Sequence, residues 1–285
     1  MTDTPGNGDA AARDGLPRPR TSAGQAGLAA LLRAPGRALI GLDFDGTLSP
    51  IVADPREARS HPGAVPALRR LAPCLGTLAV ITGRPAADAV TFGGLAAVPG
   101  IIVLGQYGLE RWEAGRLSSP PAPAGVAEAR GELPRVLAAA SAPAGVWTED
   151  KGHALAVHTR RAADPGPALS RLRGPLEALA ERTGLAVEPG RLVIELRPRG
   201  MDKGAALTTL HTERASQSVL YCGDDLGDLA AFDAVRRFRE AGTPGVTVCS
   251  GSAEAVRLAA EADLVVDGPD GVIALLNALA AALGG

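Results

Sequence analysis

Two aspartates, Asp43 and Asp45, directly follow the apolar run at residues 38–42 in the segment DFDGT. If this run is a buried parallel strand, both side chains can reach the crevice at its carboxyl end, where open α/β sheets bind ligands. Two carboxylates there can hold a hard cation such as Mg²⁺, and one can attack phosphorus to form an aspartyl phosphate. Taken alone, the segment is equally typical of a turn in which Gly46 supplies a positive φ.

Three further segments supply the other groups that phosphoryl transfer requires. Thr82 follows a second apolar run, Lys203 opens a predicted helix, and a third segment places three acids after another run. The hydroxyl and the ammonium group can bind phosphoryl oxygens, and a further acid can complete a metal site. Each residue alone is typical of a helix cap or a solvated charge, but together and in this order they favour a phosphoryl-transfer site. The acids of the third segment are Asp224, Asp225 and Asp228.

The apolar runs predict the framework that must position these residues. They alternate with helical patterns, as in a doubly wound α/β fold with a Rossmann-like parallel sheet. The runs that we interpret as strands lie at 38–42, 78–81, 101–104, 218–221, 246–249 and 264–266.

The middle of the chain has a different pattern, with two helical segments and four short strands and no long apolar run. This predicts an α/β cap domain inserted into the core. We therefore expect a disordered tail at 1–25, a core formed by 26–111 and 200–285, and a cap at 112–199 that determines substrate specificity.

Composition excludes several classes of function. The 285 residues include 29 Lys and Arg against 31 Asp and Glu, so the basic surface of a nucleic-acid-binding protein is missing. The longest apolar stretch, 272–283, is about half the length needed to span a bilayer, and no membrane partner is expected. Three cysteines without paired spacing exclude a disulfide framework and favour a cytoplasmic location.

Residues 38–283 resemble the trehalose-6-phosphate phosphatases, which are haloacid-dehalogenase-like phosphatases. The first and last matching segments are shared by that superfamily, whereas those of the cap are typical of the narrower family. The resemblance implies a haloacid-dehalogenase core with a mobile cap and Mg²⁺-dependent hydrolysis of trehalose 6-phosphate. The matching segments are DFDGTLSPIVADPREA (43–58), VITGRP (80–85), QYGLE (106–110), EDKGHALAVHTR (149–160), VIELRPRGMDKGAAL (193–207) and YCGDDLGDLAAFDAV (221–235).

The resemblance also implies roles for individual residues of the core. Asp43 would be the nucleophile, and Asp45 would protonate the departing sugar oxygen and then activate water. Thr82 and Lys203 would hold the phosphoryl oxygens, and Arg84 would lie close to the phosphate or be structural. Mg²⁺ would bind the Asp43 carboxylate, the Asp45 carbonyl and Asp224, with Asp225 or Asp228 as further support.

In the cap, the resemblance places five residues against the disaccharide: Glu149, Lys151, His158, Arg160 and Glu195. The spacing agrees, since Glu149 and Lys151 are two apart on a predicted strand, as are His158 and Arg160, so that each pair points to one face of the sheet. Carboxylates and a lysine on one surface suit vicinal hydroxyls, each of which donates and accepts a hydrogen bond. The alternative is a set of cross-strand ion pairs on a solvated face.

One segment departs from the family pattern. Where the family usually has Thr-Asp-Glu, this chain has Gly227-Asp228-Leu229, and so lacks a hydroxyl and a carboxylate. Either the outer shell of the metal site is weaker, or another residue fills this role.

We therefore expect a phosphomonoesterase that acts on trehalose 6-phosphate in trehalose biosynthesis, in functional association with trehalose-6-phosphate synthase. The alternatives are a sister phosphatase for sucrose phosphate or mannosylglycerate phosphate, and a catalytically silent homologue that binds the sugar phosphate or a synthase. A receiver domain is disfavoured, because here the predicted nucleophile follows the first strand and a cap is inserted.

Overall fold

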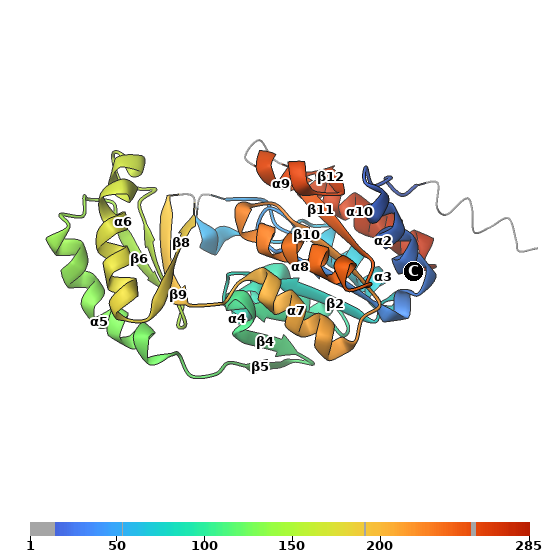
Figure 1. Ribbon diagram of the computed structural model, residues 1–285, viewed down its shortest axis with the longest axis horizontal. Coiled ribbons are helices and arrows are strands. Elements are labelled where there is room, and N and C mark those ends of the chain that lie inside the picture. Colours follow the sequence, from blue (N-terminus) through green and yellow to red (C-terminus); the bar gives the residue numbers. More distant parts are fainter. Residues whose placement is uncertain (1–14, 53, 191, 252–254) are drawn as a thin grey trace, which may run out of the picture. The chain divides into compact units, whose positions relative to one another are not determined.

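The structure is a computed structural model that describes residues 15–285 except 53, 191 and 252–254, and it contains two compact units. The core unit is formed by the chain up to Ser118 and from Asp202 onward, and the inserted unit comprises Ser119–Met201. Figure 1 labels the helices and strands of each unit.

The core unit is built on a mostly parallel sheet, as predicted. Within the described residues it has eight strands in the order β12-β11-β10-β1-β2-β3-β4-β5. Strands β12 through β3 in that order pair in parallel, whereas β4 and β5 are antiparallel. The strands are β1 (Ala38–Leu42), β2 (Thr77–Ile81), β3 (Ile102–Gly105), β4 (Glu110–Glu113), β5 (Arg116–Ser118), β10 (Ser218–Gly223), β11 (Gly245–Gly251) and β12 (Leu264–Asp267).

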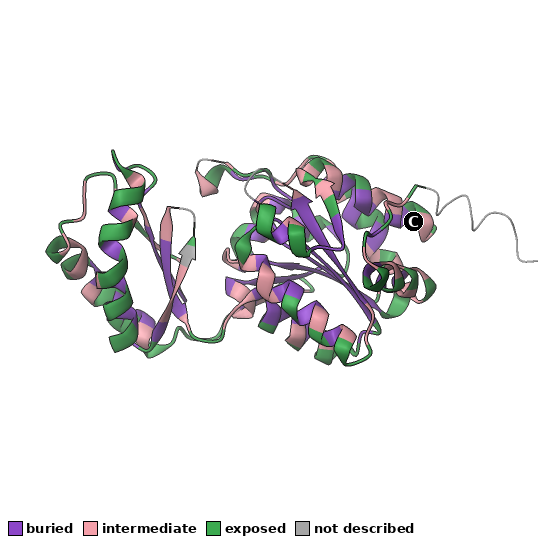
Figure 2. Ribbon diagram, turned by 45° about the horizontal axis from the view of Figure 1, so that its top comes forward, coloured by how far each residue is buried: buried purple, intermediate pink, exposed green. Residues whose placement is uncertain are grey.

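Helices cover both faces of this sheet, which explains why its central strands are apolar throughout. Ile40 of β1 packs on the side of α3 and α10, and Leu39 packs on the side of α7 and α8. Figure 2 shows the resulting band of buried residues along the strands. The helices are α2 (Ser22–Arg33), α3 (Ala64–Leu71), α4 (Ala86–Gly93), α7 (Lys203–Arg214), α8 (Leu229–Glu240), α9 (Val256–Glu261) and α10 (Gly268–Ala282).

The inserted unit is an antiparallel sheet with two helices on one face. The strand order is β6-β7-β9-β8, and residues such as Leu155 and Leu196 pack against Leu172 and Leu176 of a helix. Its elements are α5 (Ala124–Ala139), β6 (Trp147–Asp150), β7 (Leu155–His158), α6 (Pro165–Arg182), β8 (Leu185–Gly190) and β9 (Val193–Pro198). The opposite face is called the polar sheet face; its residues are Trp147, Glu149, Ala156, His158, Glu188, Glu195 and Arg197.

The structure differs from the sequence prediction at the boundary of the core and at the predicted tail. The hairpin of β4 and β5 extends the core sheet, so the core unit continues to Ser118 instead of ending at 111. Of the predicted tail, residues 1–14 lie outside the described residues. Residues 22–25, in contrast, belong to α2. The side chain of Thr21 caps this helix by accepting a hydrogen bond from the Gly24 amide at 2.9 Å. A Cβ at Gly27 would lie 2.0 Å from the Gly245 carbonyl oxygen, so α2 approaches the sheet through small residues.

None of the helices in the part of the chain that the structure describes is both long enough and apolar enough to cross a membrane.

A buried carboxylate, Asp263, joins the N-terminal segment to the edge of the core sheet. It accepts hydrogen bonds from the hydroxyl of Thr21, the guanidinium of Arg239, and the amide and hydroxyl of Thr247 at 2.8 and 2.9 Å. Burial raises the pKa of Asp263, but these hydrogen bonds outweigh it, and the pKa lies below its ordinary value.

We expect Asp263→Asn to lower the free energy of unfolding at pH 7 by on the order of 3 kcal/mol, because it leaves Arg239 without its buried partner. Since the pKa of Asp263 is lowered on folding, its stabilisation is present above the unfolded pKa of about 4 and is lost as the pH falls through the folded value. Urea denaturation should therefore show the difference between wild type and variant narrowing in acid. The control is Asp233→Asn, which removes the exposed partner of Arg236. A difference in unfolding free energy between wild type and Asp263→Asn that does not depend on pH would contradict this role of Asp263.

Candidate active site

The predicted phosphoryl-transfer residues of the core meet at the carboxyl ends of three adjacent strands. Asp43 follows β1, Thr82 follows β2 and Asp224 follows β10, and these strands are neighbours in the sheet. Lys203 joins them as the first residue of α7, whose N-terminus is capped by the Asp202 carboxylate accepting from the Ala205 amide at 2.7 Å. The topology therefore brings together groups that are far apart in the sequence.

Lys203 lies between two carboxylates in a nearly solvent-free position. Its Nζ is 2.9 Å from Asp43 Oδ1 and 2.8 Å from Asp228 Oδ1. The three side chains are 6%, 5% and 0% exposed. Burial alone would lower the pKa of Lys203, but the charges of Asp228 and Asp43 outweigh it and raise the pKa well above its ordinary value. The ammonium group therefore stays charged beside the predicted nucleophile.

Asp228 uses both carboxylate oxygens to organise this group. Oδ1 accepts from Lys203 and from the Tyr221 hydroxyl at 2.6 Å, and Oδ2 accepts from the amides of Asp224 and Asp225 at 3.0 and 3.1 Å. Tyr221 was not among the predicted site residues. The signal in the sequence was a phenol near the end of an otherwise apolar strand, three residues before Asp224.

Three acids come close enough together to hold a cation. Asp43, Asp224 and Asp228 each offer an oxygen, and these atoms lie within 4.8 Å of one another. Burial raises the pKa of Asp43 to about 8 although the charge of Lys203 opposes this shift, and burial followed by the charges of Asp43 and Asp228 raises the pKa of Asp224 to about 10. Such buried carboxylates favour a compensating charge, and an all-oxygen donor set fits a hard divalent cation.

The hydrogen bonds divide the predicted metal residues into two groups. The carboxylates of Asp43 and Asp224 are the best placed to be ligands, because Asp228 already accepts four hydrogen bonds from protein donors. Asp225 lies outside the group of three, and its Oδ1 instead accepts from the Gly227 amide at 2.8 Å. The DFDGT loop approaches Asp224 so closely that a Cβ at Gly46, where φ is +73°, would lie 2.0 Å from the carboxylate.

The departure from the family pattern has a structural consequence. Leu229, where the family usually has a glutamate, begins α8 and packs against the apolar cluster that contains Phe232 and Leu207. In this chain that position therefore adds an apolar contact to the core where the family has an acid.

Asp45 makes a two-pronged ion pair with Arg84. Arg84 Nε donates to Asp45 Oδ2 at 2.6 Å, and an Nη donates to Oδ1 at 2.7 Å. The guanidinium also donates to the Pro55 carbonyl at 2.7 Å and lies 5.6 Å from the centre of the Phe44 ring. The Asp45 side chain is 39% exposed, in contrast to the buried Asp43. The pairing of Arg84 with Asp45 was not predicted, because nothing in the spacing of two separate loops indicates it.

Thr82 is buried in a loop that is hydrogen-bonded to the QYGLE segment. Its hydroxyl accepts from the Arg84 amide at 3.2 Å, and its carbonyl accepts from the Tyr107 amide at 3.0 Å. Gln106 likewise donates its amide to the Arg84 carbonyl at 2.9 Å, with Gln106 and Tyr107 both at positive φ. This turn supports the Thr82 loop through backbone hydrogen bonds.

In the inserted unit, four of the five predicted sugar-binding residues form two side-chain contacts at the polar sheet face. His158 Nε2 is 2.9 Å from Glu149 Oε2, and Lys151 Nζ donates to Glu195 Oε2 at 2.5 Å. Lys151 comes one residue after β6, and its amide continues the pairing by donating to the Ala154 carbonyl at 2.9 Å. The fifth residue, Arg160, is exposed beyond the end of β7.

An aromatic stack next to these pairs was not predicted. The Trp147 ring is parallel to His158, with ring centres 3.9 Å apart, and the Arg161 guanidinium lies 5.5 Å from the centre of Trp147. The stack fixes the plane of the imidazole that contacts Glu149.

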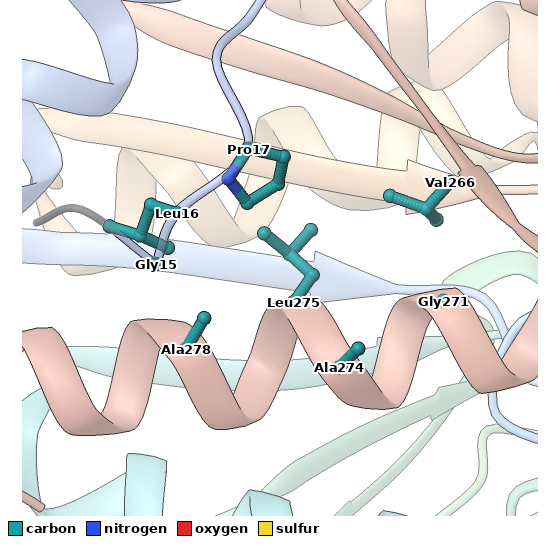
Figure 3. A pocket seen from close by; sticks show the side chains of 8 residues that line it. All are labelled: Gly15, Leu16, Pro17, Val266, Gly271, Ala274, Leu275 and Ala278. Carbon is teal, nitrogen blue, oxygen red and sulfur yellow. The ribbon is translucent and has the colours of Figure 1, made fainter.

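A hollow elsewhere in the core unit lacks the charged groups of this site. It has a volume of about 340 Å³ and lies between residues 15–17 and α10 (Figure 3). The described residues that line it are apolar side chains and glycines, including Leu16, Pro17 and Leu275, and none of them belongs to the acidic group.

Sequence comparison supports the same family as the resemblance. The pattern of the trehalose-phosphatase family matches residues 41–267. Trehalose-phosphate phosphatase of Mycobacterium marinum is 38% identical over 214 residues, which are 70% of this chain and 52% of that protein. The corresponding protein of Mycobacterium tuberculosis is 37% identical over 207 residues, covering 68% of this chain and 50% of that protein. The chain thus spans about half the length of these relatives.

Solved structures share the fold at lower sequence identity. The C-terminal domain of Candida albicans trehalose-6-phosphate phosphatase superimposes with a TM-score of 0.73 at 20% identity, covering 98% of both chains. Aspergillus fumigatus trehalose-6-phosphate phosphatase gives a TM-score of 0.63 at 24% identity, covering 93% of this chain and 99% of that chain. A haloacid-dehalogenase-like hydrolase from Bacteroides thetaiotaomicron gives 0.57 at 17% identity, covering 84% and 98%. The fold is therefore that of haloacid-dehalogenase-like proteins.

The raised pKa values predict a link between pH, stability and cation binding. Without a cation, the folded chain keeps protons on Asp43 and Asp224 that the unfolded chain has lost above pH of about 4, so stability falls as the pH rises toward 8. We expect the melting temperature in EDTA to fall over this range. Added Mg²⁺ should raise it more at the higher pH, because binding displaces protons.

Two neighbouring variants test which acid is involved. Asp224→Asn should remove most of the Mg²⁺-dependent rise in melting temperature, whereas Asp225→Asn should retain it. A rise that does not depend on pH, or that is equal in the two variants, would contradict the assignment of Asp224.

Proposed function

The chain belongs to the trehalose-phosphatase family, and on that premise we propose that it hydrolyses trehalose 6-phosphate to trehalose and inorganic phosphate. The observation that carries the phosphatase chemistry is the buried Lys203 between Asp43 and Asp228, with Asp224 beside them. This arrangement provides a carboxylate nucleophile, a fixed positive charge and a cation site within one group of side chains.

Asp43 is the proposed nucleophile. Its carboxylate oxygen attacks phosphorus, the bond from phosphorus to the sugar oxygen breaks, and an aspartyl phosphate forms. Water then attacks phosphorus, inorganic phosphate leaves and the carboxylate is restored. Lys203 and the Thr82 hydroxyl donate hydrogen bonds to phosphoryl oxygens and so stabilise the charge that shifts onto them.

Asp45 is the proposed proton carrier. It lies two residues beyond Asp43 in the same loop and is much more exposed, so it can meet the sugar oxygen on the side away from the nucleophile. It gives that oxygen a proton as the sugar leaves and takes one from the attacking water. The pairing with Arg84 holds the carboxylate in one orientation before substrate binds. On leaving this pair, Asp45 takes up from solvent the proton that it gives to the sugar oxygen.

Asp43, Asp224 and the backbone carbonyl of Asp45 would hold Mg²⁺, which when bound supplies charge that neutralises the phosphoryl group. Asp228 would support this site by fixing the Asp224 loop and Lys203.

The polar sheet face is the proposed recognition surface for the sugar. Glu195 is 6% exposed, and its Oε1 is buried without a hydrogen-bond partner in the described part of the chain, while Oε2 pairs with Lys151. A buried acceptor without a donor is rare, and a sugar hydroxyl would satisfy it. Glu149, His158 and Arg160 would supply further contacts. The substrate would come from trehalose-6-phosphate synthase, with which we propose a functional association.

Asp43→Asn should retain the fold and abolish release of phosphate from trehalose 6-phosphate, because an amide cannot form the acyl phosphate. The assay is steady-state phosphate release with Mg²⁺ by purified protein, with mass spectrometry to exclude deamidation. Asp88→Asn, a change in the first turn of α4, is the control. Turnover by Asp43→Asn close to that of wild type would overturn the nucleophile assignment.

Truncation of the polar sheet face should impair use of the disaccharide substrate. Glu149→Ala, Lys151→Ala and Glu195→Ala are each expected to lower kcat/KM for trehalose 6-phosphate by about 10-fold or more, on the order of 1.4 kcal/mol. Hydrolysis of p-nitrophenyl phosphate, which has no sugar, should change far less. Glucose 6-phosphate, sucrose 6-phosphate and mannosylglycerate phosphate complete the panel, and a wild-type preference for one of them would reject trehalose 6-phosphate as the substrate.

A further inference from the structure

The polar sheet face carries a row of three carboxylates across its four strands. Glu149 pairs with Ala156, Ala156 pairs with Glu195, and Glu195 pairs with Glu188 in the strand register. Directly paired residues point to the same face of an antiparallel sheet. The row therefore runs from β6 to β8, and Ala156 contributes only a methyl group between Glu149 and Glu195.

Each carboxylate of the row has its own basic partner on the same side of the sheet. Glu149 contacts His158 at 2.9 Å, and Glu195 contacts Lys151 at 2.5 Å. The third pair, Glu188 and Arg197 at 2.7 Å, has the same form but no role in the family resemblance. The Arg197 side chain is 10% exposed and that of Glu188 is 41% exposed. The guanidinium is therefore held within the protein, whereas the carboxylate is accessible to a ligand.

The arrangement of the row is unfavourable for stability alone. Glu188 and Glu195 are direct cross-strand partners, and like charges in that position destabilise a sheet. Glu195 is also buried and leaves Oε1 without a hydrogen bond in the described part of the chain. Residues that break local rules in this way are expected at binding sites, where a ligand supplies the missing contacts.

The length of the row indicates what it can bind. From β6 to β8 there are three interstrand spacings of about 4.8 Å, or roughly 14 Å in total. One hexose ring cannot reach across that span, whereas two linked rings with their hydroxyls can. We propose that Glu188, held by Arg197, is a further specificity-determining residue that binds a hydroxyl of the disaccharide and favours it over a hexose phosphate. This inference rests on the proposed function of the polar sheet face.

The experiment compares Glu188→Ala and the milder Glu188→Gln with Glu132→Ala. Glu132 makes a matched pair with Arg182 at 2.8 Å, but on the helices of the inserted unit. Steady-state kinetics with trehalose 6-phosphate and glucose 6-phosphate are combined with calorimetric titration of trehalose. Melting temperatures show whether each variant is folded. If Glu188→Ala is not folded, the comparison is made with Glu188→Gln alone.

We expect KM for trehalose 6-phosphate to rise about 10-fold in Glu188→Ala and less in Glu188→Gln, and trehalose affinity to fall in parallel. The ratio of kcat/KM for trehalose 6-phosphate to that for glucose 6-phosphate should fall, whereas Glu132→Ala should behave as wild type. Unchanged KM, trehalose affinity and substrate ratio in folded Glu188 variants would overturn the inference while the proposed function stands. Failure of the wild-type protein to hydrolyse trehalose 6-phosphate would instead reject the proposed function itself.

Discussion

The whole candidate site depends on one buried ammonium group. Lys203 lies between Asp43 and Asp228 with almost no contact with water, where an isolated charge of either sign would be strongly disfavoured. The pairing keeps the lysine charged and fixes the direction of the Asp43 carboxylate. Because Asp228 also binds the amides of Asp224 and Asp225, the same carboxylate sets the position of the loop that follows β10.

The acids of the candidate site repel one another, and the topology of the sheet explains why they lie together. Adjacent parallel strands end side by side, so the acids that follow β1 and β10 must lie close together. One lysine cannot neutralise three buried acids, and burial, with repulsion among the acids, raises the pKa values of Asp43 and Asp224. A divalent cation supplies the positive charge that balances such a site and lets a phosphoryl dianion bind there. Stability and function are therefore opposed here, while Asp263 at the far edge of the sheet is fully provided with donors.

The elements predicted from the sequence were those whose signal is local. Continuous apolar runs such as 38–42 form strands that are covered on both faces. Acids that directly follow such parallel strands must lie at the carboxyl edge of the sheet. The hairpin of β4 and β5 was missed because Arg111, Trp112 and Arg116 give no apolar run, and their pairing depends on the edge of β3. Helix α2 was missed because its glycines allow a close approach that only the folded chain shows, Gly27 to Gly245 and Gly24 to Asp263. The Asp45 and Arg84 pair joins two separate loops, so spacing alone could not indicate it.

Chemical trapping tests most directly whether Asp43, oriented by Lys203, becomes phosphorylated during turnover. An acyl phosphate is reduced by borohydride to an alcohol, so quenching the reaction with borohydride in the presence of trehalose 6-phosphate should convert Asp43 to homoserine. Peptide mass spectrometry would locate the change. We expect this change at Asp43 only, and only when substrate is present. Trapping at Asp45, Asp224 or another acid, or turnover with no trapped residue, would contradict it.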